Sequence, residues 1–171
     1  MVCFDASVLI DLFDPRPTNV RKQRLDVLVH DLEQSKQKII LPAPAYSEFL
    51  IGAGSAREAY HKKIEGMSNF FIEPFSKRAA MECAILLADV YSKKEQRGIS
   101  KTKIKYDWMI VSIAKAVNAT CMYTSDGDIK RACERIGMQY IMIDSIALPT
   151  PNPQLDWIKG MPPQDSSGGV A

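Results

Sequence analysis

Long apolar runs are missing from this sequence, and so are the usual marks of secretion. Apolar runs such as those at 39–41 and 108–111 fall far short of the roughly 20 residues that a membrane-spanning helix needs. The first residues contain no basic segment followed by a long apolar stretch, so we expect no signal peptide. These absences argue against a membrane or secreted protein and favour a cytoplasmic one.

Histidine is scarce, and cysteine is never paired. The four cysteines, Cys3, Cys83, Cys121 and Cys133, are scattered singly, without the C-x-x-C spacing of a zinc site or the framework of a disulfide-bonded secreted domain. We expect them to be reduced residues in or near the core. The two histidines, His30 and His61, lie in polar helical surroundings, which argues against zinc.

An excess of one charge is also absent. The formal net charge of +2 is too small to indicate a nucleic-acid partner by itself. No G-x-G-x-x-G or Walker loop occurs, which argues against a dinucleotide or P-loop enzyme. The hydrophobic fraction of 46% and the charged fraction of 25% are those of an ordinary globular protein.

Short apolar segments alternate with amphipathic ones along most of the chain. Five apolar segments are typical of buried strands, at about 2–4, 38–42, 70–75, 119–124 and 140–143. Strands that alternate with helices predict a parallel sheet covered on both faces. We therefore expect an α/β fold, a three-layer α/β/α sandwich around about five parallel strands.

The segments between these strands are expected to be helices. Helical spacing of apolar residues is clear at 20–34, and the longest such pattern runs from Ala79 to about Gln96. Its apolar stripe, which we assign to the core, consists of Met81, Ala84, Ile85, Ala88 and Tyr91. The composition changes after Leu148, so we divide the chain into one domain at 1–148 and a proline-rich tail at 149–171.

Acidic residues recur just beyond the predicted strands. They are Asp5, Glu48, Asp107 and Asp126, with Asp128 close to the last of them. Because the carboxyl ends of parallel strands meet at one edge of a sheet, we expect these side chains to converge there. Their mutual repulsion would require a cation, and oxygen ligands favour Mg²⁺ or Mn²⁺.

Two of these segments also allow interpretations other than a metal site. Asp5 or Ser7 could cap the helix that follows them, a contribution of roughly 1 kcal/mol to stability. The basic segment that carries Lys101, Lys103 and Lys105 could be a charged loop in solvent, or it could be a landing site for phosphate. The residues of these two segments taken alone leave both alternatives open.

Four short motifs nevertheless occur together. They are Phe4-Asp5-Ala6-Ser7, Tyr46-Ser47-Glu48, Tyr106-Asp107-Trp108-Met109-Ile110 and Tyr123-Thr124-Ser125-Asp126-Gly127-Asp128-Ile129. In this order they resemble the motifs of PIN-domain nucleases, and they are most similar to those of the VapC-type ribonuclease toxins of prokaryotes. The resemblance covers about residues 1–145, so it identifies the predicted domain at 1–148 as a PIN-like nuclease domain.

The resemblance implies a site with one or two Mg²⁺ or Mn²⁺ ions. Its catalytic acids would be Asp5, Glu48, Asp107 and Asp126, and Asp128 would join these four as a metal ligand that assists Asp126. Supporting hydroxyls would come from Ser7 and Thr124, and the proposed phosphate contacts are Lys101, Lys103, Lys105 and Arg131. Asp11 is expected to face solvent or a basic neighbour.

The activity implied is that of a metal-dependent endoribonuclease that hydrolyses RNA phosphodiester bonds. Such toxins commonly form homodimers, and a small antitoxin protein holds them inactive. The segment at 14–38 and the tail make this chain longer than the smallest toxins. The alternative is a non-catalytic PIN-like module that binds RNA or protein, but such a module would have lost acids that are all present here.

A third class, an enzyme that forms an aspartyl phosphate, fits the opening motif poorly. The haloacid-dehalogenase pattern has a second aspartate two residues after its nucleophile. Ser7 stands at that position here.

Overall fold

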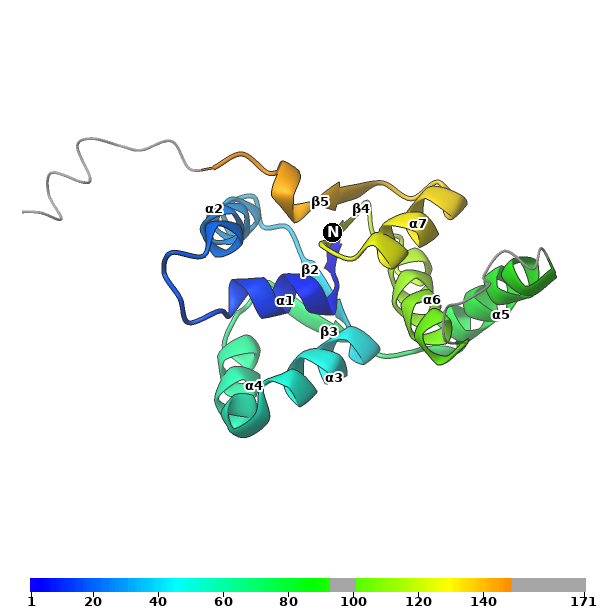
Figure 1. Cartoon of the computed structure of the whole chain (residues 1–171), viewed down its shortest axis with the longest axis horizontal. Coiled ribbons are helices and arrows are strands. Elements are labelled where there is room, and N and C mark those ends of the chain that lie inside the picture. Colours follow the sequence, from blue (N-terminus) through cyan, green and yellow to red (C-terminus); the bar gives the residue numbers. More distant parts are fainter. Residues whose placement is uncertain (93–100, 149–171) are drawn as a thin grey trace, which may run out of the picture.

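A five-stranded sheet lies at the centre of the molecule, with helices on both sides (Figure 1). The structure is a computed structural model, and it describes residues 1–92 and 101–148. The strands are β1 (Val2–Phe4), β2 (Ile39–Pro42), β3 (Phe70–Glu73), β4 (Cys121–Thr124) and β5 (Tyr140–Met142). They follow the order β3-β2-β1-β4-β5, and every neighbouring pair is parallel. The predicted parallel sheet of five strands is confirmed.

Seven α-helices are described, together with two short 3₁₀ helices. They are α1 (Ala6–Leu12), α2 (Val20–Gln34), α3 (Ala43–Gly52), α4 (Arg57–Glu65), α5 (Lys77–Ser92), α6 (Lys101–Ala116) and α7 (Gly127–Ile136), with η1 (Gly54–Ala56) and η2 (Ile143–Ser145). Helix α7 ends at Gly137, whose φ of +66° is a left-handed conformation that glycine adopts without strain.

Alternation along the strands divides the core into two halves. Phe4, Leu41 and Tyr123 face one side, where they pack against α1 to α4. Cys3, Ile40 and Met122 face the other side, where they pack against α5, α6 and α7. Since successive side chains of a strand point to opposite faces, both faces of the sheet are covered. The predicted three-layer α/β/α sandwich is therefore confirmed.

The strand order places β1 at the centre and creates a switch point beside it. From β1 the chain proceeds to β2 and β3 on one side, and then to β4 and β5 on the other. Phe4 pairs with Tyr123, so the ends of β1 and β4 lie next to each other. In open α/β sheets the crevice beyond the carboxyl ends at such a point is the usual place for ligands.

The predicted core stripe of α5 is wrong. Met81 and Ile85 are 65% and 60% exposed, and Ala84, Ala88 and Tyr91 are exposed as well. The buried face carries Ala79, Cys83 and Val90 instead, and it packs against α6. Two apolar stripes run along this helix, and α6 covers only one of them. The predicted end near Gln96 lies outside the described residues.

The basic segment before Asp107 is neither a loop nor the end of a strand. It forms the first turn of α6, because Ile104 and Trp108 are both buried and extend the helical spacing backwards. Asp107 therefore lies in the second turn of α6, and the element before α6 is a helix, α5. The prediction that Asp107 lies at the end of a strand is wrong. It reaches the carboxyl edge of the sheet because α6 passes beside β2 and α3.

The predicted tail at 149–171 lies outside the described residues, so the division at 148 stays a prediction. Within residues 1–92 and 101–148, no helix is both long enough and apolar enough to cross a bilayer.

Candidate active site

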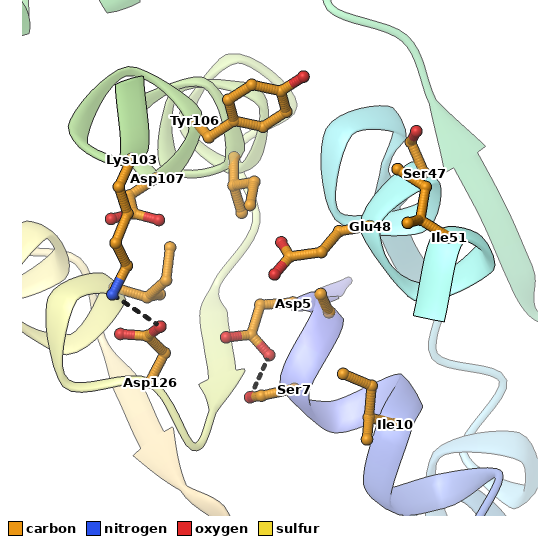
Figure 2. Close-up of a pocket in the computed structure, with 13 residues that line it drawn as sticks. Asp5, Ser7, Ile10, Ser47, Glu48, Ile51, Lys103, Tyr106, Asp107 and Asp126 are labelled. Atoms are coloured by element: carbon orange, nitrogen blue, oxygen red, sulfur yellow. Dashed lines mark hydrogen bonds and ion pairs between the residues drawn. The ribbon is translucent and has the colours of Figure 1, made fainter. Parts of the chain in front are cut away.

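A cleft of about 340 Å³ opens at the carboxyl edge of the sheet, beside the switch point (Figure 2). Its lining comes from the β1–α1 junction, α3, α6 and the β4–α7 junction. All four predicted acids line it, namely Asp5, Glu48, Asp107 and Asp126. Four motifs that lie far apart in the sequence, from Asp5 to Asp126, therefore meet in one place.

Asp5 is the most enclosed of these acids, with 2% of its surface exposed. Its Oδ1 accepts hydrogen bonds from the Val8 amide at 3.1 Å and from the Ser7 hydroxyl at 2.7 Å, while its Oδ2 accepts one from Thr124. Burial raises the pKa of Asp5 to about 6, although these three donors oppose the change. Asp5 is thus both the N-cap of α1 and a wall of the cleft.

Thr124 ties the loop of Asp126 to Asp5. The Thr124 side chain is fully buried, and its Oγ1 also accepts a hydrogen bond from the Asp126 amide at 2.9 Å. The Asp126 carboxylate caps α7 by accepting from the Asp128 amide at 2.6 Å. Ser7 completes the link, because its Oγ accepts from the Ser125 amide at 2.8 Å. Both predicted supporting hydroxyls therefore join the β1 and β4 ends.

Asp107 approaches from α6 and is half-buried. Burial is the largest cause that raises its pKa to about 7, and repulsion from Asp126 is the next. Lys103 opposes this change, while Asp128 and Glu48 add to it. The negative charge around Asp107 therefore exceeds what the neighbouring cation compensates.

Glu48 lies in the second turn of α3 and is exposed, although it lines the cleft. Its neighbours Ala45 and Phe49 are buried and fix the orientation of the helix. Figure 2 shows the Glu48 carboxylate pointing toward the space between Asp5 and Asp107.

Lys103 is the predicted phosphate contact that the cleft contains. Its Nζ pairs with the Asp128 carboxylate and lies 3.7 Å from Oδ2 of Asp126. Arg131 also pairs with Asp128, whose pKa is lowered first by the hydrogen bond from Lys103. Asp128 therefore lies beside the cleft, between two cations, and does not line it. Lys105 is exposed outside the cleft, and the Lys101 side chain lies outside the described structure.

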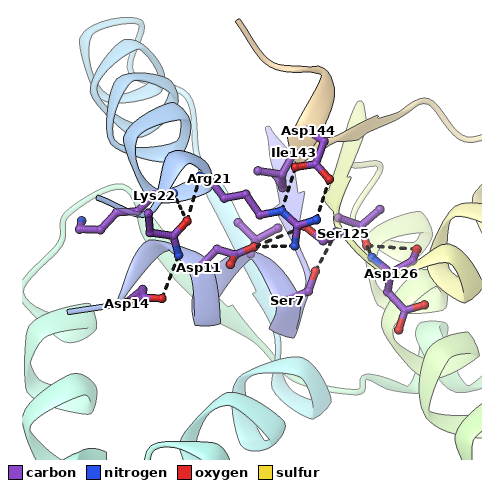
Figure 3. A network of polar contacts seen from close by, with 12 residues as sticks. Ser7, Asp11, Asp14, Arg21, Lys22, Ser125, Asp126, Ile143 and Asp144 are labelled. Carbon is purple, nitrogen blue, oxygen red and sulfur yellow. Dashed lines mark hydrogen bonds and ion pairs between the residues drawn. The ribbon is translucent and has the colours of Figure 1, made fainter. Parts of the chain in front are cut away.

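Behind the cleft, Asp11 connects α1 to α2 (Figure 3). It lies 3.6 Å from Arg21, and its Oδ2 accepts a hydrogen bond from the Ser125 hydroxyl at 3.5 Å. Arg21 also pairs with Asp144 at 2.6 Å. The expected basic neighbour of Asp11 is present. The link to Ser125 was not predicted, although Asp11 follows Ser7 by four residues and so shares its face of α1.

The chemistry of the lining suits a hard divalent cation. The lining of the cleft includes four carboxylates and the hydroxyls of Ser7 and Ser47, with neither a histidine nor a cysteine. Within residues 1–92 and 101–148, no three His, Cys, Asp or Glu side chains lie close enough to hold an ion by themselves. Mg²⁺ commonly takes one or two carboxylates and keeps several waters, so this open arrangement fits it better than it would fit zinc.

The sequence prediction missed the apolar part of the cleft. Ile10, Ile51, Tyr106, Ile110 and Ile129 line it together with the acids. Tyr106 stands directly before Asp107, and Ile129 follows Asp128, so adjacency to the acidic motifs was the available signal.

Comparisons with known proteins agree with this architecture. The family model described as "PIN domain" matches residues 2–135. A search of curated proteins gave no match. Among solved structures, the chain is similar to VapBC2 of Rickettsia felis bound to a DNA fragment from its promoter, with a TM-score of 0.62, 17% identity, and coverage of 83% of this chain and 98% of that one.

Two further structures show the same fold. VapBC-1 of nontypeable Haemophilus influenzae has a TM-score of 0.59 and 16% identity, covering 85% of this chain and 100% of that one. VapC20 of Mycobacterium tuberculosis, described as a sarcin-ricin loop cleaving toxin, has a TM-score of 0.55 and 14% identity, covering 77% and 95%. These likenesses concern the fold. The family model spans most of the chain and all four acids of the cleft, and this chain belongs to the PIN-domain family.

Proposed function

We propose that this protein is a divalent-metal-dependent endoribonuclease and the toxin of a toxin–antitoxin pair. The observation that carries the proposal is the convergence of Asp5, Glu48, Asp107 and Asp126 on one cleft. Four carboxylates that repel one another are costly unless a cation neutralises them. Burial is the main cause that raises the pKa values of Asp5 and Asp107, and repulsion from Asp126 adds to it in both cases. Membership of the PIN-domain family supports the same activity.

The four acids are the proposed ligands of one or two Mg²⁺ or Mn²⁺ ions, directly or through water. When bound, a divalent ion would supply Lewis-acid activation of water and neutralise charge on a phosphodiester. The chain itself holds Asp5 in place through Ser7, Thr124 and the Val8 amide. These fixed contacts orient one carboxylate in advance, so that less reorganisation is needed when substrate binds.

Lys103 is the proposed phosphate contact inside the cleft, because it is a cation among the lining residues. Lys101, Lys105 and Arg131 remain proposed contacts for RNA phosphates beyond the cleft. Asp128 pairs with both Lys103 and Arg131, so we propose that it positions these two cations and assists Asp126. Arg131 is 65% exposed and therefore accessible to a polyanion.

Cleavage of RNA tests the proposal. Mixed structured RNAs are incubated with the protein in Mg²⁺, in Mn²⁺ or in EDTA, and the products are resolved by electrophoresis. We expect cleavage only with metal, and a loss of about 100-fold or more in Asp5→Asn and Asp107→Asn, since even residues that only support metal ligands contribute 10- to 100-fold. The matched control is Asp26→Asn on α2, an exposed acid paired with Lys22 outside the cleft.

Equal cleavage in EDTA, or in both cleft variants, would contradict the proposal. Circular dichroism of each variant separates loss of activity from loss of folding. Single-stranded DNA of matching sequence serves as the second substrate, and cleavage of DNA in preference to RNA would contradict the ribonuclease assignment.

A small antitoxin and a second copy of the chain are the proposed partners. The solved structures from Rickettsia felis and Haemophilus influenzae, which share this fold, are VapBC assemblies, and this similarity supports the antitoxin. Sedimentation of the purified chain alone measures self-association, and sedimentation after addition of a candidate antitoxin measures the second association.

A non-catalytic PIN-like module that binds RNA or protein is the second candidate. It is favoured by one observation, that no three acids of the described chain gather closely enough to hold an ion by themselves. The cleavage assay distinguishes the two, because a binding module would retain RNA without cutting it at any metal concentration.

A further inference from the structure

Part of the cleft wall is apolar and yet open to solvent. Ile51 on α3 is 71% exposed, Ile10 on α1 is 52% exposed, and Tyr106 on α6 is 49% exposed. All three line the same cleft as the four acids. Figure 2 shows Tyr106 reaching from α6 toward the side of α3, with the carboxylates below it. We call Ile10, Ile51 and Tyr106 the apolar rim.

Folding of the described chain does not account for the apolar rim. Helix α6 buries Ile104, Trp108 and Ile110 against the rest of the protein, which turns Tyr106 toward the cleft. Among the described residues, the Tyr106 hydroxyl has no hydrogen-bond partner, and its ring contacts no other aromatic ring. Exposed apolar surface around a cleft of this kind commonly marks a binding site.

The rim and the acids together match a ligand with two chemical parts. A nucleotide carries a phosphodiester, which can bind Lys103 and, once a cation is present, the acids. It also carries a flat base, which can stack on an aromatic ring. Stacking of a base on an aromatic side chain tolerates any sequence, because every base has a π-face. A base inside a duplex is already stacked on its neighbours. The rim therefore selects an unpaired nucleotide.

The size of the cleft agrees with one nucleotide. About 340 Å³ lies at the small end of the range for small-molecule sites, roughly 300 to 1,000 Å³.

We propose that Tyr106 is a stacking platform for the nucleobase beside the scissile phosphate, with Ile51 and Ile10 completing the wall. This inference rests on the proposed ribonuclease function and assigns a substrate-binding residue to it. Tyr106 binds substrate in this account, whereas Asp5, Glu48, Asp107 and Asp126 perform the chemistry.

Binding without cleavage tests this inference. In an Asp5→Asn background that blocks cleavage, Tyr106→Ala should weaken binding of a short unpaired oligoribonucleotide by about 5- to 150-fold, the range for loss of one stacked base. Tyr106→Phe should keep the affinity, because the hydroxyl has no partner to lose. The matched control is Tyr91→Ala on α5, since Tyr91 is 42% exposed and does not line the cleft.

A fluorescence measurement gives an independent result. A Tyr106→Trp substitution in the same background should show quenched emission when unpaired RNA is added and little change with a duplex of the same sequence. Tyr91→Trp should show neither response. Because Tyr106 is exposed, none of these substitutions removes buried contacts that the fold needs.

Four outcomes would overturn the inference. If RNA binds equally well to Tyr106→Ala, or if the duplex binds as tightly as the unpaired strand, the ribonuclease proposal survives and the stacking platform does not. If a protein partner quenches Tyr106→Trp and RNA does not, the rim is a protein-binding surface. If the protein with Tyr106 intact binds no RNA at all, the proposed function fails together with the platform.

Discussion

Asp5 combines two requirements that usually fall on different side chains. As the N-cap of α1 it satisfies the Val8 amide, and as part of the cleft wall it is buried, which raises its pKa more than the charge of Asp126 does. Its hydrogen bonds with Ser7, Val8 and Thr124 fix the carboxylate at the end of the central strand. The capping interpretation and the site interpretation of the opening motif are therefore compatible, because one carboxylate has enough lone pairs for both.

The raised pKa values of Asp5 and Asp107 predict how stability depends on pH in EDTA. Both acids bind protons more tightly when folded, with pKa values of about 6 and 7, than when unfolded, at 3.8. Their contribution to stability is therefore fully present below about pH 4 and is lost as pH rises to about 7. We expect the free energy of unfolding in urea to fall between pH 5 and pH 8.

Asp107→Asn isolates one of the two groups. Because Asp107 is half-buried and partly screened, we expect this variant to reduce the decrease between pH 5 and pH 8 by roughly 1–2 kcal/mol. Asp128 and Asp144 have lowered pKa values, so their contributions change at lower pH, outside this window. An unchanged pH dependence in Asp107→Asn would show that its carboxyl is not perturbed in this way. Asp26→Asn, at an exposed site on α2, is the control.

At the scale of elements, α5 and α6 form the part of the fold that the sequence described least well. Both helices lie between β3 and β4, and they pack against each other more extensively than any other pair of helices. Helical spacing identified α5 correctly, but it could not decide which of two apolar stripes faces the protein. That choice depends on where α6 lies, which is information about tertiary packing.

Substitutions on the two faces of α5 test this arrangement. Val90 is 1% exposed, so Val90→Ala should lower the free energy of unfolding by roughly 1–3 kcal/mol through loss of packing. Ile85 is 60% exposed, so Ile85→Ala should change it by less than about 0.5 kcal/mol. Urea denaturation of both variants measures the difference. The reverse order of the two effects would restore the core stripe expected from the sequence.

The rule that acids just beyond strand ends converge at one edge of the sheet holds for two of the four acids. Asp5 follows β1 directly and Asp126 lies two residues beyond the end of β4, as residues at the carboxyl ends of parallel strands should. Asp107 reaches the cleft from the second turn of α6, so its inclusion depended on the resemblance of its motif and not on strand position. Ile10, Ile51 and Tyr106 were missed because exposed apolar residues on helices have no periodic signal that separates a binding rim from ordinary surface.

At the scale of the whole molecule, the strand order explains why the cleft lies where it does. The chain leaves β1 toward β2 on one side and later returns to β4 on the other, which separates α1 and α3 from α6 and α7. The acids come from both halves and meet between them (Figure 2). Alternation of apolar segments was sufficient to predict the five strands and three layers, since burial on both faces leaves a strong pattern.

Binding of Mn²⁺ to the metal-free protein, measured by titration calorimetry, tests most directly the central claim that these four carboxylates form a divalent-cation site. We predict saturable binding of one or two ions, weakened at least about 10-fold in each of Asp5→Asn, Glu48→Gln, Asp107→Asn and Asp126→Asn, and unchanged in Asp26→Asn. Absence of saturable binding, or equal affinity in the cleft variants and the control, would contradict the account.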